Sequence, residues 1–162
     1  MNYNIIIMEA IVKQIHKFLI KNKKIVAVAE SCTAGLLSNL LTQIPGSSQY
    51  FILGVVAYSN QAKEAILKIP HSIITKNGAV SKEVACKMAQ QIRKIFKTDF
   101  GIGITGIAGP AGGTLQKPVG TVFIAIDTKN KKICKKFHFK GSRLGIRRMA
   151  ALKALELLKR AL

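Results

Sequence analysis

Ile25-Val26-Ala27-Val28-Ala29-Glu30-Ser31-Cys32-Thr33 is the stretch from which the fold prediction starts. Its first five residues form a continuous apolar run, which is typical of a strand buried on both faces of a sheet. The polar residues after it offer Ser31 and Thr33 as helix N-caps, and residues 34–43 continue as a helix that ends at Pro45-Gly46. This segment therefore predicts a buried strand that turns directly into a helix.

Strand and helix patterns alternate on both sides of this segment. Before it, apolar residues from Met8 to Leu19 recur at the three- and four-residue spacing of an amphipathic helix. After it, the pattern predicts strands at 51–58, 100–105 and 119–126. It also predicts helices from Ser59-Asn60 to just before Pro70, from Ser81 to 97, and at 144–162.

A lysine-rich hairpin completes the predicted sheet. Residues 131–139 carry lysines on both faces and follow a turn signal at 127–130, so we expect an exposed edge strand. Strands that alternate with helices, followed by this hairpin, predict a three-layer-type α/β sandwich with a mixed, mostly parallel sheet and an antiparallel edge hairpin. With 162 residues and no repeat or linker, the chain fits one domain spanning 1–162.

The charge balance of the chain is unusual. Twenty-six Lys and Arg residues against 7 Asp and Glu give a net charge of +19, which attracts nucleic acid, acidic membranes and anionic small molecules but does not define a reaction. Three widely spaced cysteines predict a reduced, cytoplasmic protein, and we expect no signal peptide or membrane anchor. The three histidines lack metal-ligand spacing, so no metal site is predicted.

One glycine motif fits a known phosphate-binding pattern. Residues 101–106, Gly-Ile-Gly-Ile-Thr-Gly, match G-x-G-x-x-G, but the first two glycines fall inside a predicted strand and Gly109-Pro110 stands where a helix should begin. We interpret these glycines as small residues that allow close packing. The chain contains neither G-x-x-x-x-G-K-[ST] nor G-x-S-x-G, which excludes a P-loop and the nucleophile elbow of the α/β-hydrolases.

Polar clusters follow three of the predicted strands. They are Glu30 to Thr33, Tyr58 to Asn60 with Lys63, and Thr105-Gly106 leading into a glycine-rich loop. The carboxyl ends of parallel strands converge on the ligand crevice of an α/β sheet, so we expect the clusters to share one pocket. The alternative is that Ser31, Thr33, Ser59 and Asn60 are ordinary helix caps.

Lys63 carries the most specific chemical signal. It lies in the first turn of a predicted helix, where the helix dipole disfavours a cation, and burial would lower its pKa further. A neutral lysine can act as general base for a serine nucleophile. The alternative is a solvated surface lysine.

Several ordered motifs carry a family resemblance. Ala29-Glu30-Ser31-Cys32-Thr33-Ala34-Gly35-Leu36-Leu37, Pro45-Gly46-Ser47-Ser48, residues 54–63, 77–81, Ile104 to Pro110 and residues 117–122 together resemble the CinA C-terminal domain family over roughly residues 9–162. Ala34 stands where that family commonly has glycine, and Ala111 interrupts the glycine loop. Members of the family are nicotinamide-nucleotide amidohydrolases.

The resemblance implies hydrolysis of nicotinamide mononucleotide to nicotinate mononucleotide and ammonia, without a metal or organic cofactor, by a homodimer. It suggests Ser48 as nucleophile, Lys63 as base and Tyr58 as proton relay. Ser31 is the alternative nucleophile, because backbone N–H groups at a strand-to-helix turn can hold an oxyanion or a phosphate. The expected substrate-binding residues are Thr33, Gly35, Asn60, Thr105, Gly106 and Gly109, with Arg143 or Arg147 on the phosphate.

A non-catalytic binding module is the alternative function. The cationic stretch 129–140, with Phe137 and Phe139 among its lysines, could pair nucleic-acid phosphates and stack bases. The lysines are spread along the whole chain, however, so nucleic acid is a less favoured partner than a small nucleotide, and no membrane partner is expected.

Overall fold

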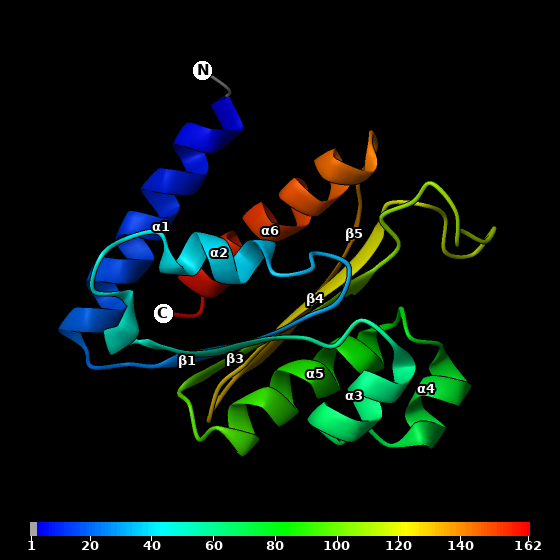
Figure 1. Cartoon of the computed structure of the whole chain (residues 1–162), viewed down its shortest axis with the longest axis horizontal. Coiled ribbons are helices and arrows are strands. Elements are labelled where there is room, and N and C mark those ends of the chain that lie inside the picture. The colour runs from blue at the N-terminus through cyan, green and yellow to red at the C-terminus, as the bar shows by residue number, and fades with distance from the viewer. Residues whose placement is uncertain (1–2) are drawn as a thin grey trace.

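The computed structural model describes residues 3–162, with side-chain surroundings from residue 6 onward. Helices and strands alternate along most of the chain (Figure 1). In chain order the elements are α1 (Tyr3–Lys21), β1 (Val26–Glu30), α2 (Leu36–Thr42), the 3-10 helix η1 (Ser47–Gln49), β2 (Phe51–Val56), α3 (Asn60–Leu67), α4 (His71–Asn77), α5 (Lys82–Ile95), β3 (Phe100–Gly106), β4 (Thr121–Asp127), β5 (Lys132–His138) and α6 (Arg143–Lys159).

The five strands form one mixed sheet in the order β2-β1-β3-β4-β5. β1 pairs in parallel with both β2 and β3, because helices cross over between these strands. β4 pairs antiparallel with β3 and β5. The predicted α/β class and the edge hairpin are confirmed, although the pairings divide evenly between parallel and antiparallel, so the sheet is less parallel than expected.

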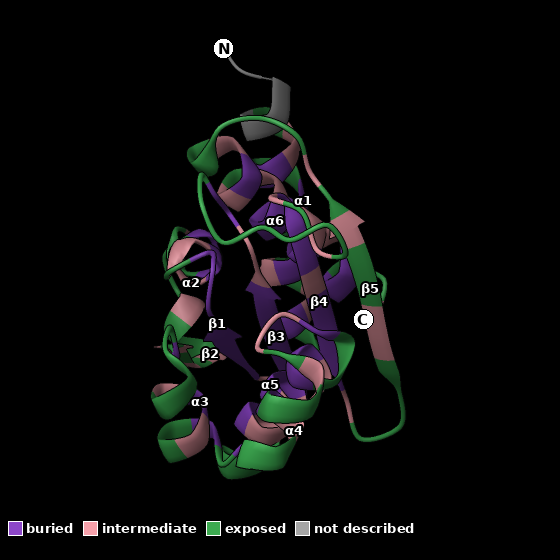
Figure 2. Cartoon of the chain, turned by 90° about the vertical axis from the view of Figure 1, so that its right-hand side faces the viewer, coloured by how far each residue is buried: buried purple, intermediate pink, exposed green. Residues whose placement is uncertain are grey.

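Helices cover both faces of the sheet and give the expected three layers. α1, α2 and α6 lie over one face, and α3, α4 and α5 lie over the other (Figure 1). The main core fills the space between the sheet and α1, α2 and α6, and a second apolar cluster lies between β1, β2 and α3 to α5. All five residues of β1 are buried, as its apolar sequence predicts, whereas the edge strand β5 is largely exposed (Figure 2).

The glycines of the G-x-G-x-x-G pattern serve packing, as expected. A Cβ on Gly101 would collide with the backbone carbonyl of Ala89, and one on Gly103 would collide with the backbone of Ala85 and Ala89. β3 and α5 therefore approach so closely that only glycine fits at these two positions. The backbone of α5 lies directly on the middle of the sheet as a result.

The structure differs from the sequence prediction in two helices. α2 begins at Leu36 rather than at 34, because Ala34 and Gly35 both have positive φ angles, 49° and 90°. α4 is absent from the sequence prediction, in which Pro70 marks only the end of the preceding helix. Pro70 also forms the N-cap of α4, a use of proline that the sequence pattern alone does not distinguish.

Candidate active site

Glu30 organises the turn that follows β1. Its side chain is fully buried, and its carboxylate accepts hydrogen bonds from the backbone N–H groups of Gly35, Leu37 and Ser38 at 2.8–3.1 Å and from the Ser38 hydroxyl at 2.6 Å. Four donors compensate the lost hydration of a buried carboxylate. The carboxylate thus fixes the start of α2 and the conformation of the turn that carries Ser31.

Lys63 reaches the same turn from the first turn of α3. Ser59 caps α3 by accepting a hydrogen bond from the Ala62 N–H, as the sequence predicts. Lys63 is 1% exposed. Its Nζ lies 3.3 Å from Ser31 Oγ and donates hydrogen bonds to the carbonyl oxygens of Ala57 at 3.0 Å and Tyr58 at 3.2 Å. The surface-lysine alternative is therefore wrong.

The surroundings of Lys63 favour its neutral form. Among the described residues, none of the salt bridges involves Lys63. Burial lowers the pKa of Lys63 below its ordinary value, since removing water disfavours the charged ammonium. Lys63 therefore has the two properties of a lysine base, which are contact with a hydroxyl and a depressed pKa.

A cavity of about 170 Å³ opens next to this pair. Three strand ends contribute to it, so the predicted convergence of the polar clusters is confirmed. Thr105 donates its hydroxyl proton to the carbonyl of Ala79 at 2.8 Å, which ties the end of β3 to the segment before α5. The lining residues are Ser31, Cys32, Tyr58, Asn60, Lys63, Ala79, Val80, Thr105, Gly106, Ala108 and Arg143.

The mouth of the cavity is cationic. Arg143, the first residue of α6, donates to the Tyr58 hydroxyl oxygen at 2.8 Å and to the Gly109 carbonyl at 2.6 Å. The Tyr58 side chain is exposed there, while its backbone carbonyl holds Lys63. Lys63 contacts Ser31 directly, so a proton can pass between them without the predicted relay through the Tyr58 phenol.

Ser48 lies at the other end of the sheet from Lys63. It belongs to η1, directly before β2, whereas Lys63 follows the carboxyl end of that strand. A strand advances about 3.3 Å per residue, so β2 separates the two positions by roughly 20 Å. The predicted pairing of Ser48 with Lys63 is therefore wrong, and Ser31 occupies the place that was assigned to Ser48.

Four of the expected substrate-binding residues lie behind the cavity rather than in its wall. Gly35 is the N-cap of α2, and Thr33 is fully buried, with its carbonyl held by Arg147 at 2.9 Å. Arg147 is therefore occupied by the protein backbone. The carbonyl of Gly109 accepts a hydrogen bond from Arg143, so Gly109 contributes to the mouth of the cavity only by positioning that side chain.

The sequence places Glu30 and Cys32 in the first polar cluster without predicting a role for either, and it does not assign Ala79, Val80 or Ala108 to the pocket. The sequence does contain a signal for the role of Glu30. An acidic residue between a buried strand and a helix can accept hydrogen bonds from the backbone N–H groups at the start of that helix. Cys32 is a rival nucleophile by position. Burial raises the pKa of Cys32 to about 12, so this thiol stays protonated and unreactive at neutral pH.

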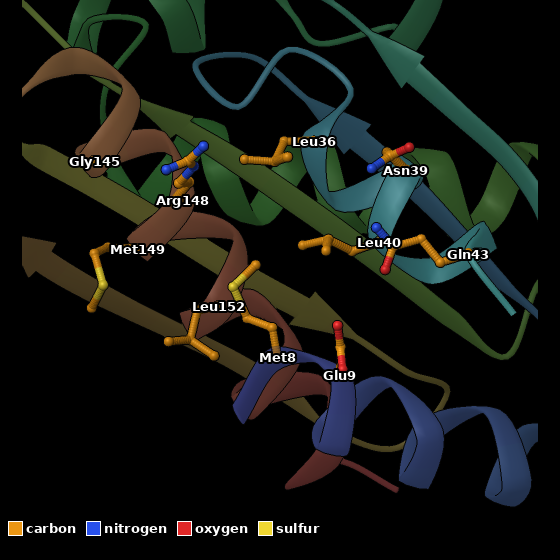
Figure 3. A pocket seen from close by; sticks show the side chains of 10 residues that line it. All are labelled: Met8, Glu9, Leu36, Asn39, Leu40, Gln43, Gly145, Arg148, Met149 and Leu152. Carbon is orange, nitrogen blue, oxygen red and sulfur yellow. The ribbon is translucent and has the colours of Figure 1, made fainter. Parts of the chain in front are cut away.

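A second cavity lies between α1, α2 and α6. Its volume is about 350 Å³, and Figure 3 shows side chains from all three helices around it. The walls are mainly apolar, with Met8, Leu40 and Leu152 among them, and Glu9 and Arg148 are its charged residues. It offers no pair of a nucleophile and a base.

The described residues contain neither a metal-ligand cluster nor a membrane-spanning helix. In that part of the chain, no three His, Cys, Asp or Glu side chains cluster as metal ligands would. None of the helices found there combines the length and the apolar character needed to cross a bilayer.

Known proteins share both the sequence and the fold of this chain. The family model described as the CinA C-terminal domain matches residues 8–162. The chain belongs to the CinA C-terminal domain family. It is 50% identical to a CinA-like protein of Desulfotalea psychrophila over 144 residues, which cover 89% of this chain and 35% of that protein. The chain thus spans about a third of the length of such curated relatives of the CinA family.

Solved CinA structures superpose closely on this fold. The competence/damage inducible protein CihA from Agrobacterium tumefaciens matches with a TM-score of 0.92 and 35% identity, covering 94% of this chain and 93% of that one. A CinA superfamily protein from Escherichia coli matches with a TM-score of 0.91 and 31% identity, covering 96% of this chain and 90% of that one. The α/β arrangement described above is thus the arrangement of the CinA family.

Proposed function

We propose that the protein is an amidohydrolase that converts nicotinamide mononucleotide to nicotinate mononucleotide and ammonia, with Ser31 as nucleophile and Lys63 as base. The observation that carries the proposal is the 3.3 Å contact between Lys63 Nζ and Ser31 Oγ beside a cavity. A serine hydroxyl is a weak nucleophile at neutral pH and needs a base within hydrogen-bond reach.

The contacts of Lys63 suit a neutral amine. A neutral amine has two N–H bonds, which match the two carbonyl acceptors, Ala57 and Tyr58. The remaining lone pair then faces Ser31 Oγ and can accept its proton. The structure thus supplies an orientation for the base as well as a depressed pKa.

The proposed reaction has two halves. Ser31 Oγ gives its proton to Lys63 and attacks the amide carbon, which forms a tetrahedral oxyanion. The Lys63 ammonium then protonates the leaving nitrogen, ammonia departs, and an acyl-enzyme remains. In the second half, Lys63 takes a proton from water, the hydroxide attacks the ester, and the proton returns to Ser31.

Backbone N–H groups next to the nucleophile are suited to the oxyanion. Within the described residues, the amides of Cys32 and Thr33 have no hydrogen-bond acceptor on another residue, whereas the amides of Ser31 and of residues 34–38 either have one or lie within α2. An amide adjacent to the nucleophile is a common donor in oxyanion holes. We therefore assign the oxyanion to the Cys32 amide, because Cys32 lines the cavity whereas Thr33 lies behind it.

The size and charge of the site favour an anionic nucleotide. Pockets that enclose a whole drug-sized ligand usually measure about 300–1,000 Å³. This cavity, at about 170 Å³, is smaller, so we place the pyridine carboxamide inside and the ribose phosphate across the mouth. Arg143 at the mouth can bind a phosphate bidentately.

The test is turnover of nicotinamide mononucleotide by the purified protein, followed as nicotinate mononucleotide by mass spectrometry and as ammonia by a coupled assay. We expect multiple turnovers by the wild type, none by Ser31→Ala, and wild-type rates from the matched control Ser48→Ala. No product from folded wild-type protein would overturn the reaction. A wild-type rate from folded Ser31→Ala would overturn the nucleophile alone.

The homodimer implied by the family resemblance is a separate proposal. Light scattering during size-exclusion chromatography measures the mass in solution, and a monomer at all concentrations would contradict it.

The nucleic-acid alternative loses part of its basis. Phe137 and Phe139 stack on each other with ring centroids 5.5 Å apart, and both pack against the main core. Their rings are therefore engaged within the fold rather than presented as a free platform for bases.

A further inference from the structure

Two cysteines from different layers meet on the face of the sheet that α5 covers. Cys86 lies in α5 and Cys134 lies in the edge strand β5, opposite Ala125 of β4. Both are half-buried free thiols, and they pack with Ala85, Ala89 and Ala125 in one small apolar cluster. Residues 48 positions apart in sequence (134 minus 86) are thus side by side.

The two thiol groups interact. Both thiols pack against the same small cluster, and each is the main influence on the pKa of the other. Cys134 Sγ also lies 4.0 Å from the carbonyl oxygen of Lys82, which is one helical turn before Cys86. The pair is therefore held between the second turn of α5 and the middle of β5.

The charge around the pair differentiates the two sulfur atoms. The interaction with Cys134 lowers the pKa of Cys86 to about 7. The positive charges of Lys82 and Lys132 also lower this pKa, whereas burial and the negative charge of Glu83 raise it. The same interaction and burial raise the pKa of Cys134. At neutral pH a substantial fraction of Cys86 is therefore thiolate, whereas Cys134 keeps its proton.

Cys86 is also accessible. It lies in the wall of a cavity of about 450 Å³ that Lys82, Lys87, Lys132 and Glu83 also line. This cavity is separate from the one at Ser31, with which it shares no lining residue. A partly exposed thiolate among lysines is the usual setting of a reactive cysteine.

We propose that Cys86 and Cys134 form a redox-active dithiol, which small peroxides oxidise to an intramolecular disulfide between α5 and β5. The inference does not depend on the proposed amidohydrolase function. Neither residue lines the Ser31 cavity.

The oxidation proceeds in two balanced steps. The Cys86 thiolate attacks one oxygen of hydrogen peroxide, the O–O bond breaks, and hydroxide leaves, so that Cys86 becomes a sulfenic acid. Cys134 Sγ then attacks the Cys86 sulfur, the S–O bond breaks, and the Cys134 proton leaves with the departing hydroxide as water. The two cysteines together lose two electrons, and peroxide is reduced to one water and one hydroxide, which becomes a second water by taking up the proton that Cys86 released on ionising.

The first experiment treats the whole protein with one equivalent of hydrogen peroxide at neutral pH, blocks free thiols with N-ethylmaleimide, and measures intact mass and peptide maps. We expect a Cys86–Cys134 disulfide, with Cys32 alkylated only after denaturation as an internal control. Intermolecular disulfides, or no disulfide with both thiols still free, would overturn the proposal.

Two variants test the order of the steps. In Cys134→Ser, the Cys86 sulfenic acid has no resolving thiol, so dimedone should trap it. In Cys86→Ser, peroxide consumption should slow at least tenfold. If Cys86→Ser is oxidised at the wild-type rate, Cys86 is not the attacking thiol and the proposal fails.

A measurement on the wild-type protein guards against misfolded variants. The rate of Cys86 alkylation by iodoacetamide should rise with pH to half its maximum near pH 7. Cys134 should react only at a much higher pH. Equal alkylation profiles for the two cysteines would contradict the inferred assignment of roles.

Discussion

Lys63 Nζ lies 3.3 Å from Ser31 Oγ, although the two residues are 32 positions apart in the chain. The contact spans two elements: Ser31 follows β1, and Lys63 lies in the first turn of α3, which follows the neighbouring strand β2. Parallel pairing of β1 and β2 places both carboxyl ends at one edge of the sheet. The chemistry of the site therefore rests on strand direction as much as on residue identity.

Replacing Lys63 by methionine should remove catalysis while leaving the fold intact. Methionine has a similar length and keeps the buried stem packed, but it cannot accept a proton. Loss of a general base typically lowers turnover by about 10²–10⁴-fold. The measurements are kcat for nicotinamide mononucleotide and, as a control, the affinity for nicotinate mononucleotide by calorimetry, which should stay near the wild-type value. A kcat within twofold of the wild type would contradict the role of Lys63.

The same substitution should make stability less dependent on pH. Burial lowers the pKa of folded Lys63 below its unfolded value, so the unfolded chain binds more protons at Lys63 between those two pKa values. Wild-type stability should therefore gain from this group as pH rises through the folded pKa towards the ordinary value of 10.5.

Lys63→Met lacks that gain. Its stability advantage over the wild type, read from urea unfolding, should be largest below the folded pKa of Lys63 and shrink as pH rises. An advantage that grows with pH would mean that Lys63 is stabilised as a cation in the folded state.

Glu30→Gln should destabilise the protein and impair the site. The carboxylate accepts three backbone N–H groups and one hydroxyl, and an amide nitrogen in place of one oxygen would face donors. Each oxygen accepts two of these bonds, so losing two bonds to a charged group, at about 1.5–3 kcal/mol each, predicts a loss of about 3–6 kcal/mol in urea unfolding. Glu64→Gln, at a more exposed pair with His71, is the matched control and should change stability by no more than about 0.5 kcal/mol. Equal losses in the two variants would contradict a special role for Glu30.

Gly103→Ala should destabilise the contact between β3 and α5. Its Cβ would meet backbone atoms of Ala85 and Ala89, which cannot move as a side chain would. Overpacking of this kind costs about 1–3 kcal/mol or more. Gly145→Ala in α6 is a suitable control because its Cβ makes only an ordinary 3.4 Å contact with the Ser142 hydroxyl. Thermal unfolding compares the two, and an unchanged Tm for Gly103→Ala would show that the helix can shift.

Arg143→Gln should weaken binding of the phosphate more than it slows the chemical step. A charge-assisted hydrogen bond worth about 1.5–3 kcal/mol predicts a KM for nicotinamide mononucleotide that is about 10–100-fold higher. Nicotinamide riboside, which lacks the phosphate, is the discriminating substrate, since its kcat/KM should change little. A similar loss for both substrates would indicate that Arg143 acts by positioning Tyr58 instead.

Much of this arrangement follows from local sequence, but the choice of serine does not follow from motifs alone. The apolar run at 25–29 predicts β1, and the cap at Ser59 predicts α3. Pro45-Gly46-Ser47-Ser48 precedes a strand, however, whereas Ser31 and Lys63 follow strands. Amino ends and carboxyl ends of parallel strands lie at opposite edges of the sheet. Strand direction therefore excludes Ser48 as the partner of Lys63.

Other features depend on tertiary contacts that no local pattern contains. The carboxylate of Glu30 finds its donors only because Ala34 and Gly35 take positive φ angles. Arg143 and Arg147 each donate to a backbone carbonyl, that of Gly109 and that of Thr33 respectively, but only Arg143 lines the cavity. One helical turn along α6 therefore separates an arginine held behind the cavity from one that lines it.

The exposed edge of the sheet has a consequence for how these molecules behave when concentrated. Within the described part of the chain, β5 has no strand on its outer side, and it carries exposed lysines at 132, 135 and 136. Open edges of this kind are templates for pairing with another chain, and like charges oppose that pairing. Two such edges would bring ammonium groups together on molecules that already have a net charge of +19. The lysines therefore oppose edge-to-edge association into fibrils. Added salt weakens this opposition, because it shortens the range of the electrostatic repulsion.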